Sequence, residues 1–189
     1  MVSLITMVQL LPQLVRASKI LNRFSKGFCA TLAVMRYVIL HNIRSSHNVG
    51  AIFRSADGAG VTKIFLTGYT PAPLDRFGRL VAEIVKTSLG ASAMVPWEQS
   101  TDISAVIVKL QKEGIAVVAI EQAVGSVSLF EYTPSEKVAY IFGNEITGVT
   151  DDVLMQCDQV VEIPMLGQKE SLNVSVTAGI VLFQKPVCG

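Results

Sequence analysis

Polar side chains that could do chemistry concentrate in three segments of the sequence, residues 41–54, 142–149 and 163–175. An arginine can bind a phosphate or stabilise a developing negative charge. A carboxylate, a hydroxyl or an amide can hold a polar ligand or handle a proton. The candidate side chains in these segments are Asn48, Arg54, Glu145, Ser171 and Asn173.

Each of these residues, taken singly, also has a purely structural explanation. Arg54 fits a surface residue whose aliphatic stem packs on the core, and Gly-Asn-Glu at 143–145 fits an ordinary turn. Asn48 and Ser171 both fit helix N-caps, because apolar periodic runs follow them. Asn173 is harder to explain in this way, because asparagine is unfavourable inside a helix.

Short apolar runs alternate with helical patterns from Tyr37 onward, which predicts an α/β fold with a parallel sheet. Ligands of such sheets usually bind beyond the carboxyl ends of the strands, and each of the three segments follows a predicted strand. Gly50 predicts close approach of another backbone or a ligand. The predicted strands are residues 37–40, 63–66, 93–96, 115–120, 138–142 and 159–163, and the predicted helices are residues 48–59, 79–89, 103–111, 151–156 and 172–183.

The three segments read, in order, N-x-G-A-I-F-R, F-G-N-E-x-x-G and I-P-M-x-G-x-x-x-S-L-N-V-S. Over residues 37–183 the chain resembles the SpoU (TrmH-like) branch of the SPOUT RNA methyltransferases. The resemblance implies a parallel sheet flanked by helices with a C-terminal deep trefoil knot, and a homodimer packed through the knotted region. It also implies S-adenosylmethionine-dependent methylation of a ribose 2′-hydroxyl in RNA. The lack of a G-x-G-x-x-G motif agrees, because this family does not hold its cofactor in the Rossmann manner.

The resemblance implies roles for particular residues. Arg54 matches the arginine thought to help activate the ribose hydroxyl. The other residues that match the catalytic motifs are Asn48, Glu145, Ser171 and Asn173. The residues that match the cofactor site are Ile120, Gly143, Ile163, Ser171 and Leu172.

A ribose 2′-hydroxyl is a poor nucleophile near neutral pH and needs proton removal or electrostatic support. Arginine stays protonated in proteins, so it is no ordinary base. We therefore expect Arg54 to hold the adjacent phosphate or to stabilise the developing alkoxide. Its position after Asn48 predicts that it points into the cofactor pocket. The sequence leaves open whether the proton passes to Arg54, a phosphate or water.

The formal net charge of +1 gives no overall sign of nucleic-acid binding, so RNA contact must come from local basic residues. We expect tRNA rather than rRNA as the substrate, because compact members of the family often act on tRNA. The chain shows no recognisable RNA-binding extension beside the matched region. The candidate RNA-binding residues, each of which also fits a solvated surface charge, are Arg44, Arg76, Arg79, Lys86 and Lys169.

Residues 1–35 contain four basic residues and no acid, and the pattern of the domain begins after them. We expect this stretch to be an extension outside the fold, followed by a methyltransferase domain over residues 36–189. An upstream start, an organelle transit peptide and a weak signal sequence all fit the stretch. Its apolar part is shorter than the ~20 residues that span a bilayer, so we expect a cytoplasmic protein with no membrane contact.

The cysteines and histidines predict no metal site. Cys29, Cys157 and Cys188 are scattered without a C-x-x-C pair, which also excludes a disulfide framework and favours reduced thiols. His41 and His47 are the only histidines and form no H-E-x-x-H pattern.

Other functions fit the sequence less well. A dehydrogenase or a P-loop ATPase would need a glycine signature that is missing, and a serine hydrolase would need G-x-S-x-G. A non-catalytic RNA-binding or assembly factor on the same fold is the main alternative. The intact set of Arg54, Glu145, Ser171 and Asn173 favours the enzyme.

Overall fold

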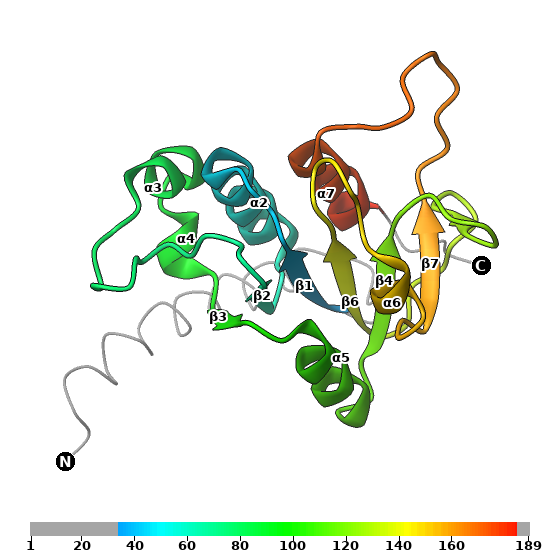
Figure 1. The fold of residues 1–189 in the computed structure, drawn as a ribbon, viewed down its shortest axis with the longest axis horizontal. Coiled ribbons are helices and arrows are strands. Elements are labelled where there is room, and N and C mark those ends of the chain that lie inside the picture. Colours follow the sequence, from blue (N-terminus) through cyan, green and yellow to red (C-terminus); the bar gives the residue numbers. More distant parts are fainter. Residues whose placement is uncertain (1–33, 185–189) are drawn as a thin grey trace, which may run out of the picture. The chain divides into compact units, whose positions relative to one another are not determined.

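The computed structural model describes residues 34–184, which form a parallel sheet with helices on both faces (Figure 1). Seven strands of this part of the chain lie in the order β3-β2-β1-β6-β4-β7-β5. The strands are β1 (Met35–His41), β2 (Lys63–Thr67), β3 (Trp97–Ser100), β4 (Ala116–Ile120), β5 (Val127–Ser128), β6 (Lys137–Phe142) and β7 (Gln159–Glu162). The helices are α2 (Ser46–Ala59), α3 (Ala82–Ser88), α4 (Ala91–Met94), α5 (Ile103–Lys112), α6 (Asp151–Leu154) and α7 (Val174–Phe183). The α/β fold predicted from the sequence is confirmed.

The expected N-terminal extension lies outside the described residues, apart from its last two, and so do the thiols of Cys29 and Cys188. Met35, which we had placed in the extension, is the first residue of β1 and pairs with Lys137 of β6. The sheet therefore begins one residue before the predicted boundary. Within residues 34–184, no helix is both long enough and apolar enough to span a bilayer.

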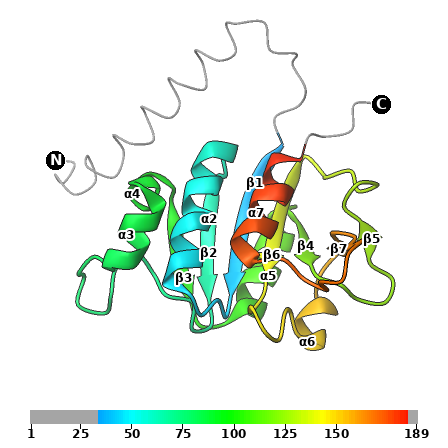
Figure 2. The ribbon, with the colours of Figure 1, turned by 90° about the horizontal axis from the view of Figure 1, so that it is seen from above.

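Side chains of the central strands alternate between two apolar cores. Val38 and Leu40 of β1 join the core beneath α2 and α7, whereas Ile39 joins the core beneath α5. Figure 2 shows α2, α3 and α7 on one face of the sheet and α5 behind it. Because both faces are covered, the strands read as continuous apolar runs rather than as alternating patterns.

One predicted strand is wrong, and the helix predicted from residue 79 begins three residues later. Residues 93–96 do not form a strand: Gly90, at φ 90°, precedes the single turn of α4, and β3 begins only at Trp97. Val95 is extended because it precedes a proline, which disfavours the helical region for that residue. Helix α3 begins at Ala82 rather than at residue 79.

The two helices that carry motif residues begin at caps other than those predicted. The Oγ of Ser45 caps α2 by accepting a hydrogen bond from the amide of Asn48 at 3.2 Å. The Oδ1 of Asn173 caps α7 by accepting from the amide of Ser175 at 2.8 Å. Asn48 therefore lies within the first turn of α2, and Ser171 lies in the loop before α7. Because Ser45 supplies the cap, the side chain of Asn48 is available for other contacts.

The sheet brings the three segments to one edge. Leu40 pairs with Phe142 in the parallel ladder of β1 and β6, so the loops that follow these strands begin at the same level. Strand β4 lies next to β6, and β7 lies next to β4. The loops after all four strands therefore leave the same edge of the sheet, where parallel folds bind ligands.

Gly50 sets the distance between α2 and α3. A Cβ at this position would lie 1.9 Å from Oγ1 of Thr87 and 2.7 Å from the carbonyl oxygen of Ile84. Side-chain atoms do not approach so closely, and only glycine lets the two helices pack here. The close approach expected at Gly50 is thus made by the backbone of α3.

We expect Gly50→Ala to lower the free energy of unfolding by about 1–3 kcal/mol, because the backbone at Ile84 must move to admit the methyl group. Urea denaturation of the purified protein measures this. Gly179→Ala is the matched control, since its Cβ would lie 4.0 Å from Oγ of Ser55 and meet nothing closer. This control should leave stability unchanged or raise it, because alanine favours a helix. An equal loss in both variants would contradict the explanation.

Candidate active site

A chain of hydrogen bonds joins the three motif segments. The Oε1 of Glu145 accepts from Nδ2 of Asn48 at 3.0 Å. The Oδ1 of Asn48 in turn accepts from Nδ2 of Asn173 at 3.2 Å. These residues are 97 and 125 positions apart in the sequence, so only the fold brings them together. Three of the five predicted catalytic residues thus form one connected cluster.

Glu145 also holds the loop that leads into α2. Its two carboxylate oxygens accept from the amides of Arg44 at 3.0 Å and of Ser45 at 3.2 Å. Partial burial raises the pKa of Glu145, but hydrogen bonds from Arg44, Asn48 and Ser45 outweigh it, and the pKa lies below its ordinary value. An ionised carboxylate that only accepts from these fixed donors is suited to positioning rather than to proton transfer.

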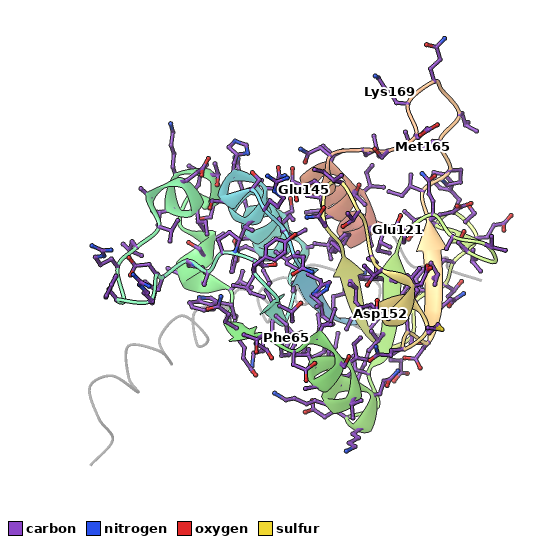
Figure 3. The ribbon with its side chains drawn as sticks, in the orientation of Figure 1. Phe65, Glu121, Glu145, Asp152, Met165 and Lys169 are labelled. Atoms are coloured by element: carbon purple, nitrogen blue, oxygen red, sulfur yellow. The ribbon has the colours of Figure 1, made fainter. Side chains whose placement is uncertain are left out.

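A pocket lies beside this cluster and is lined by all five residues predicted for the cofactor. Together with the open space at its mouth it measures about 780 Å³. Its walls combine apolar side chains with carboxylates and amides. Figure 3 shows Glu145 and Glu121 on the two loops that flank it. The lining residues include Ile120, Glu121, Gln122, Gly143, Asn144, Glu145, Ile163, Ser171, Leu172 and Thr177.

Two glycines keep the floor of this pocket compact. A Cβ on Gly143 would lie 2.4 Å from the carbonyl carbon and oxygen of Gly148. Gly148 has a φ of 65°, and a Cβ there would meet the carboxylate of Glu121 at 2.2 Å. That carboxylate accepts from the amide of Val149 at 2.8 Å. The backbone itself therefore forms this side of the pocket.

Arg54 does not line this pocket, which corrects the expectation that it points there. It is exposed in a second groove on the α2 and α7 side, together with His47, Lys86, Ser175 and other residues. Arg54 follows Asn48 by six residues on the same helix. At ~100° per residue their side chains point about 120° apart, so Arg54 points away from Glu145 and Asn173, which Asn48 contacts.

The sequence analysis missed a second cluster of hydrogen bonds, centred on the buried Asn144. The Nδ2 of Asn144 donates to the carbonyl oxygen of Asn42 at 2.9 Å and to the hydroxyl of Tyr69 at 2.8 Å. Its Oδ1 accepts from the amides of Ile146 and Thr147. Asn144 therefore shapes its own loop and ties it to the loops after β1 and β2. Its position directly before Glu145 was the only available signal, and it fitted an ordinary turn equally well.

His41 supports the same cluster from the end of β1. Its Nε2 accepts from the side-chain Nδ2 of Asn42 at 3.0 Å, which places the ring proton on Nδ1, facing Oγ1 of Thr67 at 3.0 Å. Burial lowers the pKa of His41, although the charge of Asp152 opposes this shift. Burial therefore favours the neutral form of the His41 ring in the folded protein.

The five predicted RNA-binding residues are all exposed, but they do not form one patch. Arg44 lies beside Glu145, and Lys86 lines the second groove with Arg54. Arg79 forms an ion pair with Asp75 at 2.8 Å. Lys169 stands on the outer part of the loop between β7 and α7 (Figure 3). Among residues 34–184, no three histidine, cysteine or acidic side chains gather as metal ligands.

We expect Glu145→Gln to release the loop before α2, because the amide group of glutamine would face the N–H donors that the carboxylate accepts. Hydrogen exchange of the Arg44 and Ser45 amides should speed up by roughly tenfold or more, the equivalent of about one lost hydrogen bond. Glu131→Gln is the control, because Glu131 is exposed and its carboxylate makes no hydrogen bond within residues 34–184. Unchanged exchange at both amides in Glu145→Gln would rule out this role.

The lowered pKa of His41 predicts acid sensitivity. The unfolded chain binds a proton at this residue near pH ~6.5, whereas the folded chain resists protonation. The stability contribution is therefore present above about pH 6.5 and is lost as the pH falls through this value. Thermal unfolding between about pH 7.5 and 5.5 should show a smaller loss in His41→Gln than in the original protein. The control His47→Gln should behave like the original protein, and equal losses in all three would count against the assignment.

Sequence comparison places the chain among known proteins. A model of the SpoU rRNA Methylase family matches residues 35–183. The chain is 34% identical over 145 residues to the 23S rRNA (guanosine-2′-O-)-methyltransferase RlmB of Neisseria meningitidis. The match covers 77% of this chain and 55% of the relative, so the chain spans about half the length of the curated relatives that it matches.

Solved structures agree with the sequence match. The rRNA methyltransferase of Sinorhizobium meliloti, crystallised with AdoMet, is 30% identical with a TM-score of 0.70, covering 79% of this chain and 54% of that one. The TrmH/SpoU tRNA modifying enzyme of A. aeolicus is 25% identical with a TM-score of 0.69, covering 88% of this chain and 80% of that one. The resemblance found in the three motifs is confirmed, and this chain belongs to the SpoU rRNA methylase family.

Proposed function

We propose that this protein methylates a ribose 2′-hydroxyl of ribosomal RNA with S-adenosylmethionine as the methyl donor. The observation that carries the proposal is the hydrogen-bonded cluster of Glu145, Asn48 and Asn173 beside a pocket lined by every predicted cofactor residue. The matched relatives are named as 23S rRNA (guanosine-2′-O-)-methyltransferases or as rRNA methyltransferases, which favours rRNA over the tRNA expected from the sequence.

The pocket suits this cofactor chemically. Ile120, Ile163 and Leu172 offer apolar surface for a purine ring, and Glu121 and Glu145 place carboxylates where a cationic group is favoured. When bound, S-adenosylmethionine supplies an electrophilic methyl group on a sulfonium. We propose that the chain from β6 to α7 forms the trefoil knot of the family, with the loops after β4, β6 and β7 as the walls of the pocket.

The residues around the pocket would have different roles in methyl transfer. Glu145 holds Asn48 and the loop before α2 in place, and Asn173 fixes the start of α7. Ser171, exposed at the rim of the pocket, can contact the nucleotide whose hydroxyl reacts. Alignment of the hydroxyl with the methyl group would supply much of the rate enhancement. As the new carbon–oxygen bond forms, the methyl–sulfur bond would break to leave a neutral thioether, and the proton of the 2′-hydroxyl would pass to water.

A homodimer would explain the position of Arg54. The exposed side of α7 carries Val176, Ile180 and Phe183, which are 49%, 39% and 59% exposed and would be covered by a second copy. Val176 and Phe183 also line the groove that contains Arg54. We propose that Arg54 of one protomer reaches the pocket of its partner and stabilises the developing alkoxide or the adjacent phosphate.

The direct test is methyl transfer. The protein should incorporate methyl groups from labelled S-adenosylmethionine into 23S rRNA transcripts, and mapping should place the modification on a ribose 2′-oxygen. tRNA transcripts serve as the comparison substrate. If calorimetry shows cofactor binding but no RNA in a total RNA preparation is methylated, the non-catalytic alternative is favoured. Absence of cofactor binding at millimolar concentration would refute the proposal.

We expect Arg54→Ala to lower single-turnover methylation by roughly 10²-fold or more, because a charge-stabilising donor acts mainly in the transition state. Cofactor affinity should change by less than about threefold. Arg54→Lys should also be slow, since an ammonium cannot make the planar two-pronged contact. The control is Lys112→Ala on α5, an exposed cation on the opposite face of the sheet.

Mixing two inactive variants tests the dimer. If Arg54 acts across the interface, a mixture of Arg54→Ala and Asn173→Ala should recover activity, because mixed dimers contain one intact site. No recovery in proven mixed dimers would place Arg54 and the pocket in the same protomer. Near-normal turnover of Arg54→Ala would make Arg54 an ordinary surface residue.

A further inference from the structure

The connection between β2 and α3 carries an exposed aromatic side chain with two guanidinium groups close to its ring. Phe77 is 64% exposed. The Cζ atoms of Arg76 and Arg79 lie 4.8 and 4.9 Å from the centre of its ring. This arrangement belongs neither to the pocket beside Glu145 nor to the groove around Arg54.

The segment is a small hairpin with its own internal bonds. Leu74 and Leu80 form an antiparallel bridge across its base. The Oδ1 of Asp75 accepts from the amides of Phe77 at 2.8 Å and Arg79 at 2.9 Å. The Nε of Arg79 donates to Oδ2 of the same carboxylate at 2.8 Å. The tip is thus held in one conformation without support from the core, which lowers the entropic cost of binding a partner.

The exposed groups of this hairpin match the chemistry of unpaired nucleotides. A phenyl ring offers a stacking surface that any base can use, and guanidinium groups both stack on bases and bind phosphates. Arg76 makes no ion pair within residues 34–184, so its charge is available to a ligand. Double-stranded RNA would not fit so well, because its bases are already stacked and paired.

The hairpin is also connected to the candidate active site. It follows β2, which is parallel to β1, so both strands end at the same edge of the sheet (Figure 2). Tyr69, directly after β2, is 60% exposed and its hydroxyl accepts from Asn144, the neighbour of Glu145. An RNA strand that reaches the pocket can therefore continue along this edge toward Phe77.

We propose that the hairpin of residues 74–80 binds single-stranded RNA by stacking an unpaired base on Phe77, with Arg76 on a flanking phosphate and Arg79 held beside the ring by its ion pair with Asp75. The RNA would be the segment next to the methylated nucleotide. This inference rests on the proposed function only in taking RNA as the ligand.

The test is fluorescence anisotropy of the full-length protein with a labelled single-stranded RNA 12-mer and with the duplex of the same sequence. Phe77→Ala should weaken binding of the single strand by roughly tenfold, as loss of one stacked base does. Phe77→Trp should bind the single strand about as tightly as the original protein, because an indole ring can also stack on a base. Arg76→Ala should reduce the slope of log affinity against log salt concentration by about one, as loss of one phosphate contact does. Phe130→Ala is the matched control, an aromatic residue that is 69% exposed after β5, and it should leave binding unchanged.

Several outcomes would overturn the proposal. Unchanged binding by Phe77→Ala, or equal losses in Phe77→Ala and Phe130→Ala, would remove the stacking role. A change in particle mass of Phe77→Ala without a change in RNA affinity would instead make the hairpin a protein contact. Cofactor calorimetry and methyl transfer are measured in parallel. RNA binding that depends on Phe77 in a protein that transfers no methyl group would refute the proposed function and leave this proposal standing.

Discussion

The candidate site depends on one carboxylate. Glu145 accepts hydrogen bonds from two amides of the loop before α2 and from the side chain of Asn48. Asn48 in turn accepts a hydrogen bond from Asn173. Within residues 34–184 these two amides donate to no other acceptor, so Glu145 holds the loop in its position. A lowered pKa follows from the same bonds, which keeps the carboxylate charged and its geometry fixed.

This constraint separates positioning from chemistry. A carboxylate whose pKa is lowered by three fixed donors is poorly placed to accept a proton, so the proposed methyl transfer depends on alignment and on a nearby positive charge. The only arginine of the first motif faces a different groove, alongside Lys86 and the start of α7. The described residues that line the pocket combine carboxylates and amides with apolar surface and include no lysine or arginine, which is why the proposed mechanism takes its cation from a second copy.

Much of this architecture could be predicted from local signals. Apolar runs gave the central strands to within one or two residues, because strands buried on both faces must be apolar throughout. Three motifs placed after strands predicted a site at the carboxyl edge, and all five proposed cofactor residues line one pocket there. The wrongly predicted strand also came from a local signal. The run at 93–96 fitted a strand, yet Gly90 and Pro96 left room only for a helical turn before β3.

The sequence by itself determined the alternation of strands and helices, the family, and which residue types stand at the ends of the strands. Tertiary structure decided which of those residues act together. Asn48 fitted a cap as well as a site residue until Ser45 was found to cap α2. Arg54 shares a helix with Asn48 but faces another groove, because six residues of helix turn its side chain about 120° away. The physical reason is the same in each case: contacts such as Glu145 to Asn48 span about a hundred residues, and sequence spacing carries no information about them.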